Sequence, residues 1–257
     1  MSIPTYEIYA LKYAGPFTRP ASMMVWFQDM DKTVQTDYFI FAIRGGGETI
    51  VVDCGVRPDL AVERQLAGYV NPVEVLKRIG IDAGRLKHLV VTHIHFDHAS
   101  GIRLFPKANI YVQEKEFRFW IKDPIAKRAP FLHVSDLGAN QYLKKLEGSK
   151  RLHLIRGDKK ILPGIELLLA PGHTPGMQAV AVNTAKGKAI VGSDVAHFFV
   201  SYRNDIPSAI ITDMRAWMKS YDKLRAKASS LDLMFPGHDP AMLEIFPRVA
   251  EEVVRLV

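Results

Sequence analysis

The chain has 257 residues, of which 48% are hydrophobic and 24% charged, a balance typical of a globular protein with a sizeable buried core. The formal net charge is +7, but no run of basic residues exceeds two. We therefore expect a solvated cationic surface without a nucleic-acid partner, and a bias towards anionic substrates stays open. The one cysteine, Cys54, excludes an internal disulfide and sits in an apolar segment as a small buried residue.

The first residues show neither a signal for secretion nor a membrane span. Met1–Glu7 lacks a basic start followed by an apolar core, and no apolar run in the chain approaches the roughly 18–20 residues that cross a bilayer. We therefore expect a cytoplasmic location. Residues 1–30 are rich in proline, methionine and aromatic residues without a helical period, so they either line a pocket or cover the edge of the core.

The first half of the chain alternates strands and helices. Two β-rich runs, 38–43 and 49–53, flank a glycine turn and predict a hairpin. A helix is expected from Pro72 to about Gly80, because Asn71 suits the N-cap, proline the first position and glycine the end. The remaining predictions of this half are strands at 85–92 and 109–112 and a helix at 114–121.

The second half is predicted to be mostly β. After a helix near 139–146, strands are expected at 151–155, 165–170, 178–182 and 188–192. An amphipathic helix follows, capped by Thr212 or Asp213, then a short strand at 231–235 and a closing helix at 246–257. With no linker between the halves, we expect one domain over 1–257, built from two similar halves with a sheet-on-sheet core and helices outside.

The most informative stretch is a cluster of potential metal ligands after the strand at 85–92. His93, His95, Asp97 and His98 lie within six positions. His93 and His95 point the same way on an extended backbone. Imidazole and carboxylate groups suit zinc and its first-row neighbours, and four of them at this spacing can serve two metal sites. The alternative is a run of polar loop histidines.

Three further strand ends carry matching groups. His173 lies between two Pro/Gly pairs, Asp194 ends the strand at 188–192, and His238 follows a Pro-Gly turn. Each alone is a weak signal, but strand ends on one edge of a sheet converge on a shared site. Of the remaining histidines, His88, His133 and His153 are expected to be surface or structural residues.

These residues resemble the metallo-β-lactamase superfamily. Its His-x-His-x-Asp-His motif is matched in full by 93–98, its later ligands by His173, Asp194 and His238, and its early Asp-x-Gly motif by Asp53. The resemblance covers roughly 38–240. It implies a four-layer αββα sandwich, an α/β (α+β) fold, with a dinuclear metal site on one edge.

The resemblance also implies the roles of the ligands. One metal is expected on His93, His95 and His173, the other on Asp97, His98 and His238, with Asp194 bridging them. Two divalent ions are implied: zinc first, with iron, manganese or cobalt able to use the same ligands. Hydroxide held between them would attack the carbonyl of a lactone. Asp97 is assigned to the catalytic residues as well as to the metal ligands.

Within the superfamily the chain looks most like the N-acyl homoserine lactonases, enzymes of quorum quenching. The similarity lies in 162–168, 171–176, 95–99 and 236–239. One position departs from that group, since His197 stands three residues after Asp194, where those lactonases have a tyrosine that contacts the substrate carbonyl. A histidine can also donate a hydrogen bond or a proton, so His197 is a candidate catalytic residue; the alternative is packing at the rim.

The departure leaves the substrate open. A small-molecule lactone or ester is expected, either an N-acyl homoserine lactone or another lactone such as 4-pyridoxolactone. A thioester, amide or phosphodiester on the same fold is the alternative. Substrate selection is expected from three segments around the sheet edge, namely 17–27, 56–70 and 195–211. The oligomeric state is not predicted, and a homodimer is one option.

Overall fold

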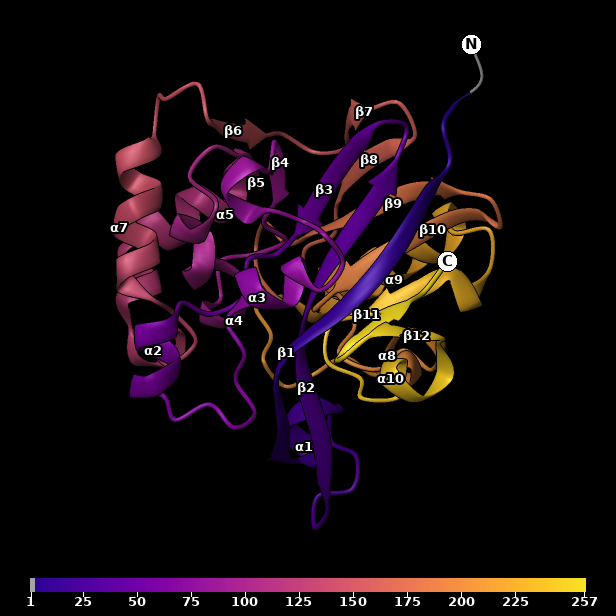
Figure 1. Cartoon of the computed structure of the whole chain (residues 1–257). Coiled ribbons are helices and arrows are strands. Elements are labelled where there is room, and N and C mark those ends of the chain that lie inside the picture. The colour runs from indigo at the N-terminus through magenta and orange to yellow at the C-terminus, as the bar shows by residue number, and fades with distance from the viewer. Residues whose placement is uncertain (1–2) are drawn as a thin grey trace.

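The computed structural model describes residues 3–257 and places two β-sheets face to face (Figure 1). In spatial order, the eight-stranded sheet contains β12 (Arg248–Ala250), β13 (Val253–Arg255), β1 (Tyr6–Pro20), β2 (Thr33–Gly45), β3 (Glu48–Val52), β4 (His88–Val90), β5 (Asn109–Gln113) and β6 (Leu152–Ile155). The five-stranded sheet contains β11 (Met234–Pro236), β10 (Gly187–Ser193), β9 (Gln178–Thr184), β8 (Ile165–Leu169) and β7 (Lys159–Leu162).

Helices and helical turns lie on the outer faces and in the connections. The α-helices are α1 (Ala21–Met24), α2 (Pro58–Glu63), α3 (Pro72–Lys77), α4 (Phe96–Ala99), α5 (Glu114–Phe117), α6 (Ala129–Leu132), α7 (Leu137–Leu146), α8 (Phe199–Arg203), α9 (Met214–Lys227) and α10 (Met242–Ile245). Tighter or wider turns are η1 (Ala83–Arg85), η2 (Ser100–Leu104), η3 (Arg118–Lys122), η4 (Pro124–Lys127) and η5 (Leu231–Leu233). No helix within 3–257 has the length and apolar character needed to cross a bilayer.

Side-chain alternation along the strands separates three apolar layers. In β2, Phe39 and Phe41 face the layer between the sheets, while Ile40 faces the layer under the helices of the first half. In β9, Val180 faces the same central layer and Ala181 the layer under α9. Because both faces of these strands are covered, they read as nearly continuous apolar runs.

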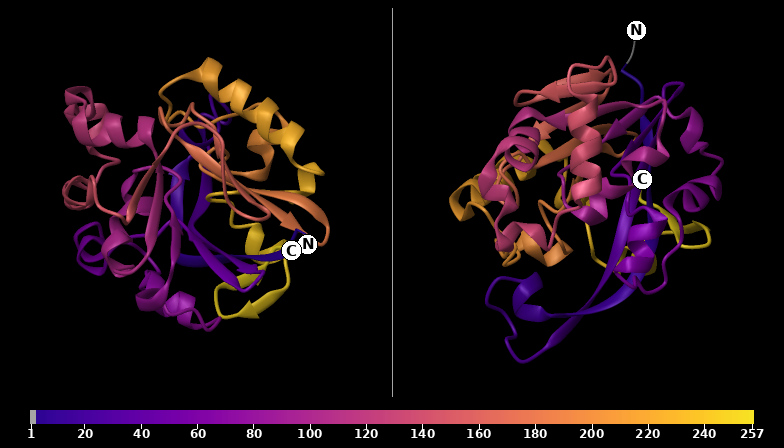
Figure 2. Two further views of the ribbon diagram at one scale, coloured as in Figure 1. Left: turned by 90° about the horizontal axis from the view of Figure 1, so that it is seen from above. Right: turned by 90° about the vertical axis from the view of Figure 1, so that its left-hand side faces the viewer.

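Figure 2 shows the resulting order of layers: helices, sheet, sheet, helices. Val75 and Leu143, from α3 and α7, pack on the outer face of the first sheet. Trp217 and Tyr221, from α9, cover the second sheet. This arrangement confirms the predicted four-layer αββα sandwich.

Most predicted elements of the first half are present. The hairpin of β2 and β3 pairs as expected, and α3 begins after Asn71, whose side chain accepts a hydrogen bond from the Val73 amide at 3.0 Å. The helix predicted at 114–121 forms as α5 followed by the wider turn η3. The strand predicted at 85–92 is shorter at both ends: β4 spans His88–Val90, Arg85 ends the turn η1, and residues 91–92 lead into the histidine cluster.

The prediction of a closing helix at 246–257 is wrong. The segment forms the hairpin of β12 and β13, and β13 pairs antiparallel with β1 through Leu11 and Val253. Val253 and Val254 are both fully buried, one on each face of the sheet. Pairing with the long strand β1 buries both valines, whereas a surface helix would bury only the residues on one of its faces. The sequence pattern did not reveal this pairing.

Candidate metal centre

The predicted ligand residues meet at the edge where several strands end. His93, His95, Asp97 and His98 follow β4 and enter α4, and Asp194 comes directly after β10. His173 lies in the loop after β8, and His238 follows β11. All seven side chains are buried. The convergence expected from strand ends is therefore present.

Their ligating atoms form two groups, each compact enough to hold an ion. One group consists of His93, His95 and His173, and the other of Asp97, His98 and His238; within each, the ligand atoms lie within 4.8 Å of one another. Asp194 belongs to further groups that share His93, His98 and His173 with these two. Its carboxylate therefore stands between them, as the predicted bridging role requires.

Neighbouring acceptors fix which ring nitrogen three of the five ligand histidines present. The Nδ1 of His98 donates to Asp53 at 2.8 Å, that of His173 to the Ile210 carbonyl at 2.7 Å, and that of His238 to the Asp37 carbonyl at 2.9 Å. The Nε2 atoms of these rings are thereby directed into the site. Such partners orient the ligands of metal centres and hold the correct tautomer.

Unpartnered buried atoms show that the residues fit a metal. The Nε2 atoms of His93 and His98 and one carboxylate oxygen of Asp194 are buried without a hydrogen-bond partner. A buried polar atom without a partner is costly, and cations between these atoms would supply the missing interaction. Imidazole and carboxylate groups together are the donor set of zinc and related divalent ions.

The electrostatics of the cluster agree with this fit. Burial and the neighbouring imidazoles hold the pKa of His93 and His95 well below the usual range, so both rings are neutral and able to ligate at pH 7. Burial also opposes charge on His98, but the carboxylates of Asp194 and Asp97 outweigh it and raise its pKa. In the absence of a cation, a proton on His98 offsets these carboxylates; a bound metal would replace it.

Asp53 contacts the ligand cluster through hydrogen bonds. It is fully buried at the end of β3, and its carboxylate accepts from the Thr92 amide at 2.7 Å, from the Ser193 hydroxyl at 2.9 Å and from His98. Asp53 and Ser193 both adopt positive φ, at 64° and 47°, directly after or at the end of their strands. Such strained conformations concentrate at functional sites, and here they join the two sheets under the ligands.

A cavity of about 240 Å³ opens above the ligands. Its wall includes His95, Asp97, His173, Asp194, His197, His238, Met23, Met24, Thr36, Tyr38, Phe96, Val134, Ile210, His133, Arg19 and Arg64. All three segments expected to select the substrate contribute to this wall. Two aromatic residues of these segments, Trp26 and Tyr69, do not line the cavity. The Tyr69 hydroxyl instead donates to the Val56 carbonyl at 2.8 Å.

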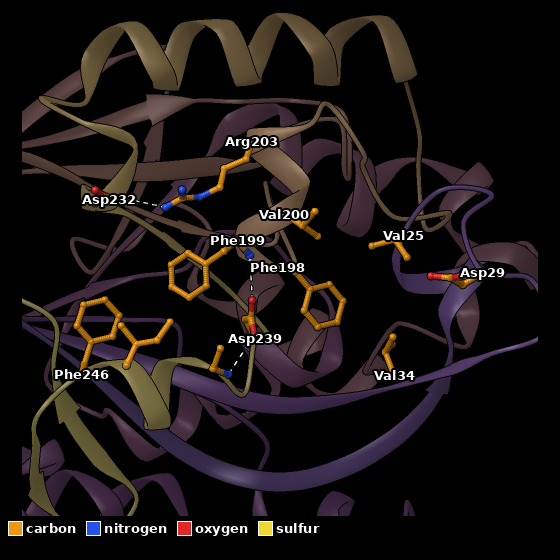
Figure 3. A pocket seen from close by; sticks show the side chains of 12 residues that line it. Val25, Asp29, Val34, Phe198, Phe199, Val200, Arg203, Asp232, Asp239 and Phe246 are labelled. Atoms are coloured by element: carbon orange, nitrogen blue, oxygen red, sulfur yellow. Dashed lines mark hydrogen bonds and ion pairs between the residues drawn. The ribbon is translucent and has the colours of Figure 1, made fainter.

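A larger cavity, about 690 Å³, lies away from the ligands between α8, α10 and the residues that follow α1 (Figure 3). Phe198, Phe199 and Phe246 give it an apolar wall. Asp239, on the same wall, has its carboxylate engaged by the Phe199 and Ala241 amides, both at 3.0 Å. No ligating group of the metal cluster lines this second cavity.

His197, which only the family resemblance singled out, lies beside the ligand cluster. It is buried, its Nε2 lies 3.3 Å from Asp194, and its Nδ1 is buried without a partner. Burial lowers the pKa of His197 to about 3, so the ring is neutral at pH 7. His88 and His153 lie outside the cluster, in hydrogen bonds to Tyr111 and Asn109, as expected for structural histidines.

A sequence model of the Metallo-beta-lactamase superfamily matches residues 35–238, which contain every ligand candidate. The chain belongs to the metallo-beta-lactamase superfamily. The family resemblance and the enzyme class expected from the motif are thereby confirmed: the chain is a hydrolase of this superfamily.

Relatives of this superfamily member are lactonases. An N-acyl homoserine lactonase of Bacillus sp is 28% identical over 208 residues, which cover 74% of this chain and 76% of the relative. The N-acyl homoserine lactonase AttM of Rhizobium radiobacter is 24% identical over 182 residues, covering 70% and 68%.

Solved structures of lactonases share the fold. The crystal structure of a quorum-quenching N-acyl homoserine lactone lactonase matches with a TM-score of 0.80 at 22% identity, covering 99% of this chain and 100% of that one. AidC, described as a dizinc quorum-quenching lactonase, matches with a TM-score of 0.68 at 19% identity, covering 93% and 90%.

Sequence reasoning missed one buried carboxylate of this metallo-beta-lactamase fold. Glu116 in α5 is fully buried, and its Oε1 accepts from the Ile94 amide at 3.0 Å and from Trp120 at 2.7 Å. Its Oε2 accepts from the Thr174 hydroxyl and the Gly176 amide, both at 2.8 Å. Glu116 thus connects the two loops that carry His95 and His173. Its place on a helix beside charged residues gave no sequence signal.

Proposed function

We propose that this chain is a dinuclear metal-dependent hydrolase that opens the ring of a lactone. Two complete three-residue groups with Asp194 between them are the observation that carries the proposal. When bound, a pair of divalent cations activates water at neutral pH and polarises the ester carbonyl. Zinc is the first choice for the N/O donor set.

The protein side chains hold the ions and supply a hydrogen-bond donor. His93, His95 and His173 would hold one ion, and Asp97, His98 and His238 the other. His197 faces the same cavity from beside Asp194, where its neutral ring can donate a hydrogen bond to the substrate carbonyl. No serine or cysteine nucleophile is needed.

N-acyl homoserine lactones are the first substrates to test, because the named relatives act on them. The size of the cavity, about 240 Å³, lies below the range of roughly 300–1,000 Å³ usual for drug-sized ligands. This favours a compact ring at the metal centre, so a bicyclic aromatic lactone such as 4-pyridoxolactone is the second candidate.

Metal analysis combined with a substrate panel tests the proposal. The gently purified protein should contain about two divalent ions per chain, and it should hydrolyse at least one of the homoserine and aromatic lactones. Chelation should abolish the activity, and added zinc, manganese or cobalt should restore it. A protein that binds no ion, or a metal-loaded protein that cleaves thioesters or phosphodiesters but no lactone, would contradict the proposal.

A further inference from the structure

Two arginines in the wall of the metal cavity have no acidic partner. Arg19, near the end of β1, and Arg64, just after α2, both line the cavity and are half-buried. Neither forms an ion pair with a carboxylate anywhere in 3–257. Two other half-buried arginines do, Arg57 with Asp136 at 3.1 Å and Arg225 with Asp205 at 2.8 Å, whereas Arg44 and Arg151 donate to backbone carbonyls.

Arg64 is held in place by neutral groups. Its guanidinium lies 3.9 Å from the centre of the Phe96 ring, and Phe96 stands between the ligand candidates His95 and Asp97. One nitrogen donates to the His133 carbonyl at 3.0 Å and another to the Ser135 carbonyl at 3.2 Å. The stacking and these two bonds orient the group without neutralising its charge.

Arg19 is held in a similar way. Its guanidinium donates to the Tyr38 hydroxyl at 3.2 Å and lies 5.3 Å from the centre of the Phe17 ring. The Tyr38 ring in turn packs 5.2 Å from the ring of His238. Both arginines are therefore fixed through aromatic residues that touch or adjoin the metal ligands, on a wall shared with the reacting centre.

Before metals are counted, the two arginines and the two carboxylates of the cavity lining balance in formal charge. Its only acidic lining residues are Asp97 and Asp194, and both belong to the ligand groups. Two divalent cations would use that negative charge, so nothing remains to balance the guanidinium groups. Guanidinium groups with free donors in a partly buried cavity bind carboxylate or other oxyanions strongly, because the hydrogen bonds are charge-assisted.

We infer that this cavity selects lactones that carry an anionic group, a carboxylate first of all, on the part of the molecule that is not hydrolysed. The inference rests on the proposed lactonase function and names the substrate class of that site. Arg64 and Arg19 bind the anionic group while the ester lies against the metal ligands. The carboxylate that hydrolysis creates forms at the metal centre and is common to every lactone, so it does not distinguish one substrate from another.

A matched pair of lactones tests the inference. N-succinyl homoserine lactone carries a free carboxylate, and N-succinamoyl homoserine lactone carries a neutral amide of nearly the same size. Loss of a charge-assisted hydrogen bond corresponds to about tenfold to a hundredfold in binding. The zinc-loaded protein should therefore show a kcat/KM about tenfold or more higher for the succinyl compound, mainly through KM, and added salt should reduce this ratio.

Variants assign the preference to the two arginines. Arg64→Met and Arg19→Met keep an unbranched apolar side chain against the aromatic rings, and each should lower the ratio of the two kcat/KM values several-fold. Arg103→Met is the matched control: Arg103 also lies over a ring, 5.1 Å from the centre of Tyr142, and donates to a backbone carbonyl, but it does not line the cavity. The control should keep the parent ratio, and thermal unfolding should confirm that each variant is folded.

Each outcome is decisive. A parent ratio near one overturns the inference while leaving lactone hydrolysis intact. The inference also fails if both methionine variants slow the two lactones equally, because the arginines would then act on something that both substrates share. If a variant does not fold, the salt dependence of the parent ratio still decides: a salt-independent ratio overturns the inference. If neither homoserine lactone is hydrolysed but an aromatic lactone is, the inference fails while the proposed function stands; hydrolysis of no lactone at all overturns both.

Discussion

At the scale of single residues, the ligand candidates are recognisable because their chemistry leaves a trace in the sequence. His173 and His238 each follow a strand and a Pro-Gly pair, a context that surface histidines lack. Arg19 and Arg64 leave no such trace, since an arginine in a loop looks the same whether or not its charge is balanced. Only the folded chain reveals the missing carboxylate.

His197 is the residue whose role the fold sharpens most. Its ring stacks 5.3 Å from the ring of His238 and stands 3.3 Å from Asp194, yet its Nδ1 has no partner. The neutral ring therefore has one nitrogen left over with which to contact a ligand in the cavity. Packing at the rim alone would not require burial of that atom without a partner.

We predict that His197→Phe lowers kcat on a lactone by about 100-fold, the scale seen when a transition-state hydrogen-bond donor is lost, and leaves two metals bound. His197→Tyr restores a donor at this position and should recover part of the loss. Steady-state kinetics and metal analysis of the purified variants check both statements. Loss of metal from His197→Phe would instead assign His197 to the ligand set.

At the scale of elements, α5 connects the two loops that carry the first group of ligands. The loop around His173 approaches α5 so closely that a Cβ on Gly176 would overlap the backbone of Glu116. Trp120, in the turn that continues α5, packs with its ring centre 5.3 Å from that of His95. A short helix therefore sets the distance between ligands that are 78 positions apart in the chain.

We predict that Glu116→Gln weakens metal binding by about tenfold, as changes in the residues that support metal ligands commonly do. The amide nitrogen cannot accept, so either the Ile94 and Trp120 donors or the Thr174 and Gly176 donors lose their acceptor. Competition with a chromophoric chelator measures the affinity, a readout separate from activity.

Glu114→Gln is the matched control for this variant. Glu114 also lies in α5, but its carboxylate pairs with the exposed Arg118 and Arg156, and surface pairs of this kind contribute little. The control should bind metal like the parent protein. Equal affinity in both variants would show that Glu116 stabilises the fold without positioning the ligands.

Elements were predictable where local and tertiary preferences agree. Asn71 and Pro72 predicted the start of α3, and Asp213 caps α9 through the Ala216 amide at 2.9 Å. The prediction for 246–257 was wrong because the buried valines of this segment fit a helical stripe as well as a strand. Pairing with β1 decides between the two, and a pairing partner more than 240 residues away is invisible to a local pattern.

At the scale of the whole molecule, the metal centre joins the two sheets. Its ligands come from loops after β4 in the first sheet and after β8, β10 and β11 in the second. Asp53 and Ser193, which end corresponding strands, meet in a hydrogen bond beneath them. The two similar halves expected from the sequence are therefore tied together at the site, which supports our proposal of one domain over 1–257.

Removal of the metals tests that proposal. A ligand that binds only the native state stabilises it by about 4 kcal/mol at a thousandfold excess over its Kd, so chelation should lower the unfolding temperature by several degrees. Because both sheets share the ligands, the apo and the metal-loaded protein should each unfold in one transition. Differential scanning calorimetry, with the calorimetric enthalpy compared with the van't Hoff enthalpy, measures both effects. Two separate transitions, of which only one responds to the chelator, would show that the halves fold independently and that the metal stabilises one of them.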